Sequence, residues 1–204
     1  MRHTYEHTKT GGKTLNAEKV LLNRIRSGDH EAFSLLVEDF LLPAFRTAYV
    51  ILRSKEYAED AVQNALEDCY ISIMKNKEIR NFRAWFYRVV YNRAIDIYRV
   101  NARKEEVNID EHHEIVVDLQ QTTILQLIQN EDKSEMLDLI NRLPMEQGIP
   151  LLLHYYEELS VKEVSLILNE NINTIKTRLA RGRKKLGVLF IESRNCEMKG
   201  ELHV

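Results

Sequence analysis

Hydrophobic residues recur along this chain mainly at spacings of three and four, which is the period of an α-helix. The clearest case is residues 56–74, where one face carries Ala58, Ala61, Val62, Ala65, Leu66, Cys69 and Ile73. Residues 82–99 repeat the pattern, with an apolar side formed by Trp85, Phe86, Val89, Val90, Ile95 and Ile97. No alternation of period two persists anywhere. The pattern therefore predicts an all-α protein.

Glycine and proline mark where the helices should begin and end. Gly28 should end an opening helix, and Pro144 should end a later helix near residue 142. Pro43 interrupts a helical pattern, so we expect a kink or two helices there. Gly148 and Pro150 interrupt another. Because proline suits the first turn of a helix, we expect the next helix to start at Pro150.

Residues 160–186 have the pattern of a helix, a tight turn and a second helix. Ser160 and Glu163 form a capping box, in which each side chain accepts a bond from a free backbone N–H at the helix start. Asn169 can adopt the left-handed backbone of the turn, and Asn171 can cap the second helix. This order of elements predicts a helix-turn-helix.

The second of these helices combines an apolar side with strong positive charge. Residues 174–187 hold six lysines and arginines and no acid, while Ile175, Leu179 and Leu186 fall on one side. Uncompensated positive charge beside an apolar docking side is what a major-groove reader needs. The alternative is a solvated basic face on a structural helix, as most charge runs are.

Charge is segregated along the chain, although the net charge is only −2. Residues 75–104 hold nine lysines and arginines against Glu78 and Asp96, and residues 105–118 hold six acids without lysine or arginine. Two basic segments separated by an acidic one indicate two contacts with nucleic acid and a spacer of different character.

Aromatic residues are interleaved with the first basic segment. They are Phe82, Trp85, Phe86, Tyr87, Tyr91 and Tyr98. Basic groups follow phosphates and aromatic faces can receive an unstacked base, so the mixture favours capture of single-stranded DNA. The alternative is that they belong to the core, as we expect for at least half of them.

Several other classes of protein are disfavoured. No apolar run approaches the roughly 18 residues of a membrane helix, and the first residues lack the apolar stretch of a signal peptide. Cys69 and Cys196 lie in unlike contexts, and we interpret them as reduced cytosolic thiols rather than a disulfide. The histidines show no metal-ligand spacing, and no phosphate loop or nucleophile motif is present, so we expect no cofactor, no metal and no enzymatic activity.

Four segments resemble bacterial extracytoplasmic-function (ECF) sigma factors. Residues 82–99, FRAWFYRVVYNRAIDIYR, resemble that family's FRAWLYRIARNLAIDYLR type of segment, and residues 58–63, AEDAVQ, resemble its AEDLVQ. Leu143 and Pro144 with LLLHYYEELS over residues 151–160 resemble the lead-in to its second domain. Residues 174–186, TIKTRLARGRKKL, resemble TVKSRLHRARKKL. The resemblance covers about residues 17–192 in the family's order and spacing.

The resemblance implies two small helical domains joined by an acidic flexible linker. A disordered lead-in would occupy residues 1–16, sigma region 2 residues 17–103, the linker residues 104–133, sigma region 4 residues 134–193, and a tail residues 194–204. In this family the linker threads toward the polymerase active-site cleft, so its acidity could mimic nucleic acid. Neutralising the six acids tests whether it is more than a solvated tether.

The resemblance also assigns roles to individual residues. The −10 promoter element would be opened and held by Arg80, Asn81, Phe82, Arg88, Asn92, Arg93 and Arg99, with the loop over residues 75–82 cupping a flipped base. The −35 element would be read by Lys176, Thr177, Arg178, Ala180, Arg181 and Arg183. The core polymerase contact would involve Asp60, Gln63 and Asn64, although the residues after Gln63 depart from the family pattern.

The implied function is that of a cytoplasmic alternative sigma factor, whose partners are core RNA polymerase (clamp and flap), promoter DNA and an anti-sigma factor, often membrane-tethered, with no membrane insertion by this chain. The alternative is a conventional helix-turn-helix repressor or activator that binds duplex DNA without polymerase. Such a protein usually dimerises on a palindrome and needs no strand-opening segment.

Overall fold

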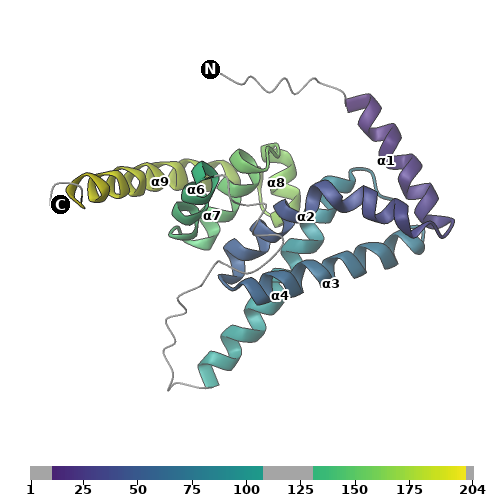
Figure 1. Cartoon of the computed structure of the whole chain (residues 1–204), viewed down its shortest axis with the longest axis horizontal. Coiled ribbons are helices and arrows are strands. Elements are labelled where there is room, and N and C mark those ends of the chain that lie inside the picture. The colour runs from purple at the N-terminus through teal and green to yellow at the C-terminus, as the bar shows by residue number, and fades with distance from the viewer. Residues whose placement is uncertain (1–10, 108–130, 201–204) are drawn as a thin grey trace.

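The computed structural model of the chain describes residues 11–107 and 131–200, and these are helical without any strand. Four helices come first, α1 (Gly11–Arg26), α2 (His30–Leu52), α3 (Lys55–Met74) and α4 (Phe82–Val107). The second part contains α6 (Glu131–Asn141), α7 (Met145–Leu151), the π-helix η1 (Leu152–Tyr156), α8 (Val161–Leu168) and α9 (Ile172–Gly200). Figure 1 shows α9 reaching away from the body of the molecule. The all-α prediction is confirmed.

The first helices begin and end where local chemistry dictates. α1 starts at Gly11, inside the segment predicted to be a disordered lead-in, and the chain turns at Gly28, whose φ of +94° is a conformation that glycine adopts without strain. Asp29 caps α2 by accepting from the Ala32 N–H. A kink or two helices were expected at Pro43, and two helices are excluded because α2 runs through Pro43 without ending.

Helices α3 and α4 complete the first unit, packing on α2 and on each other. Ser54 caps α3 by accepting from the Tyr57 N–H. The buried face of α3 consists of Ala58, Ala61, Val62, Ala65, Cys69 and Ile73, which confirms the predicted apolar stripe. On α4 the buried residues are Phe82, Phe86, Tyr87, Val90, Ala94 and Ile95. Because the α3 face is mostly alanine, the neighbouring helices can approach it closely.

The segment around Pro150 differs from the prediction. The helix starts at Met145, just after Pro144, rather than at Pro150. Pro150 lies inside α7, where it has no N–H to donate to the carbonyl of residue 146. The next turn widens into η1, in which the Glu157 N–H reaches the Leu152 carbonyl at 2.9 Å. We attribute the error to this widened register, which a period of 3.6 does not reveal.

The helix-turn-helix is formed as predicted. Ser160 and Glu163 make the reciprocal bonds of a capping box at the start of α8. Asn169 ends α8 with a φ of 53°, and the Asn171 side chain accepts from the Asn173 N–H at 2.8 Å at the start of α9. Ile175 and Leu179 are buried on the side of α9 that docks into the second unit. Local capping thus accounts for the whole turn.

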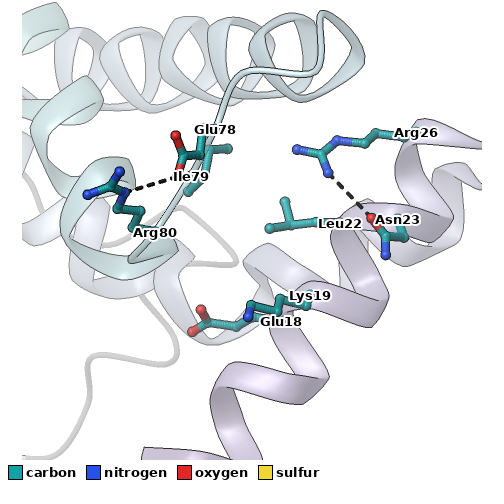
Figure 2. Close-up of a pocket in the computed structure, with 8 residues that line it drawn as sticks. All are labelled: Glu18, Lys19, Leu22, Asn23, Arg26, Glu78, Ile79 and Arg80. Carbon is teal, nitrogen blue, oxygen red and sulfur yellow. Dashed lines mark hydrogen bonds and ion pairs between the residues drawn. The ribbon is translucent and has the colours of Figure 1, made fainter.

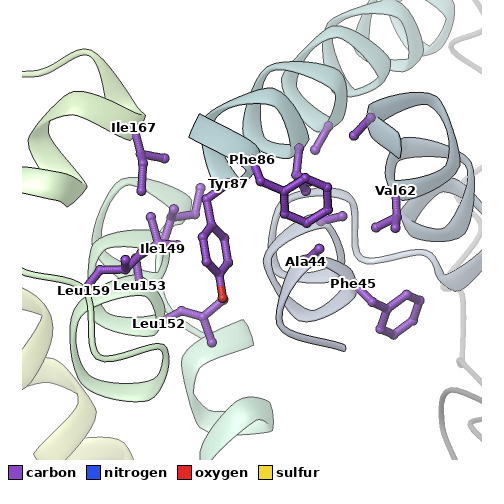
Figure 3. Packing of buried hydrophobic residues seen from close by; sticks show 14 of the residues in the cluster. Ala44, Phe45, Val62, Phe86, Tyr87, Ile149, Leu152, Leu153, Leu159 and Ile167 are labelled. Atoms are coloured by element: carbon purple, nitrogen blue, oxygen red, sulfur yellow. The ribbon is translucent and has the colours of Figure 1, made fainter. Parts of the chain in front are cut away.

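The two units are not separate bodies, because one hydrophobic cluster runs through both. α8 packs against α4, and α7 packs against α2. Figure 3 shows the Tyr87 ring between Leu152 and Leu153 of the second unit and Phe86 and Ala44 of the first. The sequence analysis predicted two domains and gave no sign of this contact. The acidic stretch of the predicted linker lies mainly in residues 108–130, outside the described residues.

Candidate nucleic-acid and polymerase interfaces

The basic side of α9 is open to solvent. Lys176, Thr177, Ala180, Arg181 and Arg183 are exposed, while Ile175 and Leu179 hold the opposite side against the second unit. Spacings of three and four place these exposed residues on one side of the helix. No acid lies on α9 between residues 172 and 187. α9 therefore presents a continuous basic surface, as the sequence predicts.

Two of the arginines predicted to read the −35 element already contact other side chains of the protein. Arg178 donates to Glu170 at 3.0 Å from a half-buried position. Arg183 donates to the Tyr155 hydroxyl at 2.9 Å and lies over the Tyr155 ring, 5.9 Å from its centroid. Both contacts hold the side chain in one orientation. Arg178 would have to exchange Glu170 for a base or a phosphate to contact DNA.

A second basic surface follows α4. Arg88, Asn92 and Arg99 are exposed at spacings of four and seven, which puts them on one face of the helix. Arg93 is turned instead toward α3, where it forms an ion pair with Asp68, and that bond is the main cause of its raised pKa. Of the arginines on this helix that are predicted to contact the −10 element, Arg93 is thus the one turned toward α3.

A pocket of about 560 Å³ lies between α1 and the loop that precedes α4 (Figure 2). Arg26 of α1 fixes this loop by donating to the Lys77 carbonyl at 3.2 Å. Burial raises the pKa of the Glu18 carboxyl, while a backbone bond from Phe82 opposes the shift. The exposed Arg80 side chain forms an ion pair with Glu78, another residue of the loop, at 3.0 Å. The pocket falls within the size range of small-ligand sites.

Asn81 and Phe82, at the start of α4, have different environments. The Asn81 side chain is exposed and caps α4 by accepting from the Ala84 N–H at 2.9 Å. Phe82 is only 1% exposed and stacks on Phe86, with Phe40 and Trp85 tilted against it. The prediction that Phe82 contacts DNA is therefore wrong, since its ring is part of the core of the first unit.

The residues predicted to contact core polymerase share one face of α3. Asp60, Gln63 and Asn64 are all exposed, and spacings of three and four align them. They lie opposite the alanine-rich face that packs against α2 and α4. The geometry leaves them free to meet a partner.

Sequence reasoning missed a set of residues that join the two units. Arg46, Arg83 and Tyr87 from the first unit meet Glu157 from the second, and Asn81 meets Glu163. No local signal identifies such pairs, because their members are 70 or more residues apart. The sequence offers a hint in Arg46, a charged residue within a mostly apolar stretch of α2.

Other kinds of site are not evident in residues 11–107 and 131–200. No group of histidine, cysteine and carboxylate side chains is placed to hold a metal there. No helix among the described residues is long and apolar enough to cross a membrane. Cys69 is a free thiol, and burial together with Asp68 raises its pKa to about 12.

Comparison with known proteins decides the family. Residues 36–104 match Sigma-70 region 2, and residues 133–186 match Sigma-70, region 4. The ECF RNA polymerase sigma factor SigW of Bacillus subtilis is 30% identical over 179 residues, covering 82% of this chain and 94% of SigW. The chain belongs to the ECF family of sigma factors. As an ECF sigma factor it is a transcription initiation factor, and its relatives are not enzymes.

Further relatives of this ECF sigma factor agree. The ECF sigma-E factor of Haemophilus influenzae is 25% identical, covering 83% of this chain and 93% of its own. The solved structure of CnrH in complex with the cytosolic domain of CnrY has a TM-score of 0.61 at 20% identity, covering 86% and 98% of the two chains. The sigma factor RpoE with the anti-sigma factor NepR, from Bartonella quintana, has a TM-score of 0.60 at 23% identity, covering 79% and 96%. These two structures share the fold.

Proposed function

We propose that this chain joins core RNA polymerase, directs it to promoters with −10 and −35 elements, and promotes opening of the DNA. The observation that carries the proposal is the pair of exposed basic surfaces, on α9 and on α4, each inside the segment matched by a sigma region. Two such surfaces in one chain suit the two separate elements of a promoter. Transcription on core polymerase would also place the protein in the cytoplasm.

Each element of the promoter has a proposed reader. Lys176, Thr177, Ala180 and Arg181 supply donors and a methyl group to base edges in the major groove of the −35 element. Phosphates hold the register of such a helix, and Arg183 is placed to contact one. Arg178 joins the reading once Glu170 releases it.

The −10 element would be met by α4 and the loop before it. Asn92, with Arg88 and Arg99 on the same face, would lie along the DNA backbone. The pocket beside Arg80 and Ile79 would receive an unstacked base. With Phe82 assigned to the core, the binding energy for that base would come from the loop backbone and the pocket walls rather than from this ring.

Two protein partners follow from the family. Core polymerase would dock on the α3 face that carries Asp60, Gln63 and Asn64. An anti-sigma factor would be the second partner. The similar sigma factor RpoE was solved with the anti-sigma factor NepR, and the similar protein CnrH was solved with the cytosolic domain of CnrY.

Run-off transcription from a genomic promoter library tests the proposal, with core polymerase present in every reaction and this chain added or omitted. New transcripts that start at defined sites only when the chain is present are the expected result, and they would reveal both promoter elements. A shift of duplex DNA without core polymerase, and no new transcripts with it, would instead indicate a conventional helix-turn-helix regulator.

A further inference from the structure

The loop between α3 and α4 is held by α1 at both of its ends. Near its start, the Arg26 guanidinium donates to the Lys77 carbonyl at 3.2 Å. At its end, the Phe82 N–H donates to the Glu18 carboxylate. Residues 78–80, which line the pocket, lie between these two points. Figure 2 shows the α1 residues and the loop residues on opposite sides of that pocket.

The bond from Phe82 satisfies a donor at the start of α4. Phe82 is the first residue of α4, so its N–H has no acceptor within the helix. Asn81 satisfies a different donor, since its side chain accepts from the Ala84 N–H at 2.9 Å. The first turn of α4 contains no acidic residue of its own. Glu18 therefore supplies, from another helix, the negative charge that stabilises a helix N-terminus.

The contact at Lys77 fixes the chain just after it leaves α3. Asn76 has a left-handed φ of 56°, and the Lys77 N–H donates back to the Ser72 carbonyl at 3.2 Å. The end of α3 thus holds the Lys77 N–H while Arg26 of α1 holds the Lys77 carbonyl. The other terminal nitrogen of Arg26 donates to the Asn23 side chain at 3.3 Å, which keeps the guanidinium in place. The direction of the loop is therefore set by α1 and α3 together.

Helix α1 is firmly packed and can support these contacts. Leu22 and Ile25 are 5% and 0% exposed and belong to the hydrophobic core. Glu18, Leu22 and Arg26 follow one another at spacings of four, so the two polar groups lie on either side of a buried anchor. α1 also packs against both α2 and α3. Moving either end of the loop away from α1 therefore breaks a polar contact with a fixed element.

We propose that Glu18 and Arg26 are positioning residues for capture of the −10 base. They hold both ends of residues 77–82 so that the pocket is formed before the base arrives, and they do so without contacting the base. A loop that is already ordered loses less conformational entropy on binding. The inference rests on the proposed function, because base capture is the step that this loop serves. Both residues precede residues 36–104, which match Sigma-70 region 2, so the −10 reader extends beyond that segment.

Amide hydrogen exchange of the full free chain, followed by nuclear magnetic resonance, tests the contact itself. Glu18→Leu removes the acceptor of the Phe82 N–H, whose exchange should quicken on the order of 10-fold. The Ala84 N–H keeps its acceptor on Asn81 and should exchange as before, which separates the loss of one bond from fraying of α4. Glu18→Gln retains an acceptor oxygen and should keep the Phe82 N–H protected.

A second experiment measures opening of a promoter identified by the run-off assay, with core polymerase and permanganate footprinting. Two templates are compared, the intact promoter and one made abasic at the −10 position where base substitution slows the wild-type protein most. Glu18→Leu and Arg26→Met should each slow opening about 10-fold on the intact template, and neither should slow it on the abasic template, where no base remains to be captured. Glu18→Gln should restore opening. Arg24→Met is the matched control on α1, because Arg24 pairs with Asp29 in an exposed position and should leave both rates unchanged.

Several results would overturn the proposal. Unchanged exchange at Phe82 in Glu18→Leu would show that α1 does not hold the start of α4. Equal slowing on both templates would indicate a general loss of structure, and normal opening despite faster exchange would show that the loop needs no fixed ends. A Glu18→Gln protein that keeps the protection but not the opening would make Glu18 a contact to the base. If wild type yields no transcripts with core polymerase, the proposed function fails and the positioning role falls with it, even where exchange confirms the bond.

Discussion

Gly182 lies where α9 packs against α7 without room for a methyl group. A Cβ built there would meet Leu151 Cδ1 at 2.8 Å, Leu151 Cγ at 3.2 Å and the Gln147 carbonyl oxygen at 3.3 Å. Leu151 is 2% exposed, so its side chain has no open space to move into. On the same helix, a Cβ at Gly187 would meet nothing within 4 Å. The two glycines therefore separate helix propensity from packing.

The expected effects of Gly→Ala differ in sign at the two positions. In a helix interior alanine is favoured over glycine by about 1 kcal/mol, so Gly187→Ala should stabilise the protein by about that amount. Gly182→Ala gains the same propensity, but forcing a methyl group into a filled site costs about 1–3 kcal/mol. We expect Gly182→Ala to be less stable than wild type by about 1 kcal/mol, and less stable than Gly187→Ala by about 2 kcal/mol.

Urea unfolding followed by far-ultraviolet circular dichroism measures these differences, with unchanged slopes required before midpoints are compared. A double variant supplies the control. In a Leu151→Ala background the main clash is gone, so Gly182→Ala should become stabilising. If Gly182→Ala were as stable as Gly187→Ala in the wild-type background, the close packing of α9 on Leu151 would be refuted.

Three further predictions concern the promoter surfaces and the core. Arg181→Ala should weaken binding to the −35 element by about 1–3 kcal/mol and relax base choice. Arg178→Ala should cost less, because Arg178 must give up its ion pair with Glu170 before it can contact DNA. Binding titrations with core polymerase on variant −35 sequences compare the two. Asn92→Ala should leave −35 binding intact but slow open-complex formation measured by permanganate footprinting, and unchanged opening would remove Asn92 from the −10 surface. In a Cys196→Ser protein the Cys69 thiol, with its pKa of about 12, should resist alkylation at pH 8 until urea unfolds the chain; rapid native labelling would contradict its burial.

Sequence alone predicted the features that depend on near neighbours. The capping box at Ser160 and the left-handed turn at Asn169 use residues within a few positions of each other, and both are formed. The alanine-rich face of α3 follows from a helical period and is likewise buried. Where propensity, capping and period agree, little remains for tertiary contacts to alter.

The failures have long-range causes. Tyr87 is one of six aromatics for which the sequence left both DNA capture and a place in the core open. The structure buries it, and its hydroxyl donates to the carboxylate of Glu157, 70 residues away. Phe82 sits at the edge of a basic loop, yet packing on Phe40 makes it a core residue. The exposure of Asp60 and Arg181 agrees with their predicted roles without testing them. Contact between distant segments is information that periodicity does not contain.

The π-helix η1 behaves as a single extra residue inserted into an otherwise regular helix. Each α-helical residue turns the chain by about 100°, so removing one residue from η1 would rotate everything after it relative to α7. Glu157 follows η1 directly, and its carboxylate would then point away from Arg46 and Tyr87. A one-residue deletion in η1 would therefore break the contact of Glu157 with Arg46 and Tyr87 while leaving the sequence of α9 unchanged. The length of this segment, as well as its residue types, therefore sets how the second unit is oriented against the first.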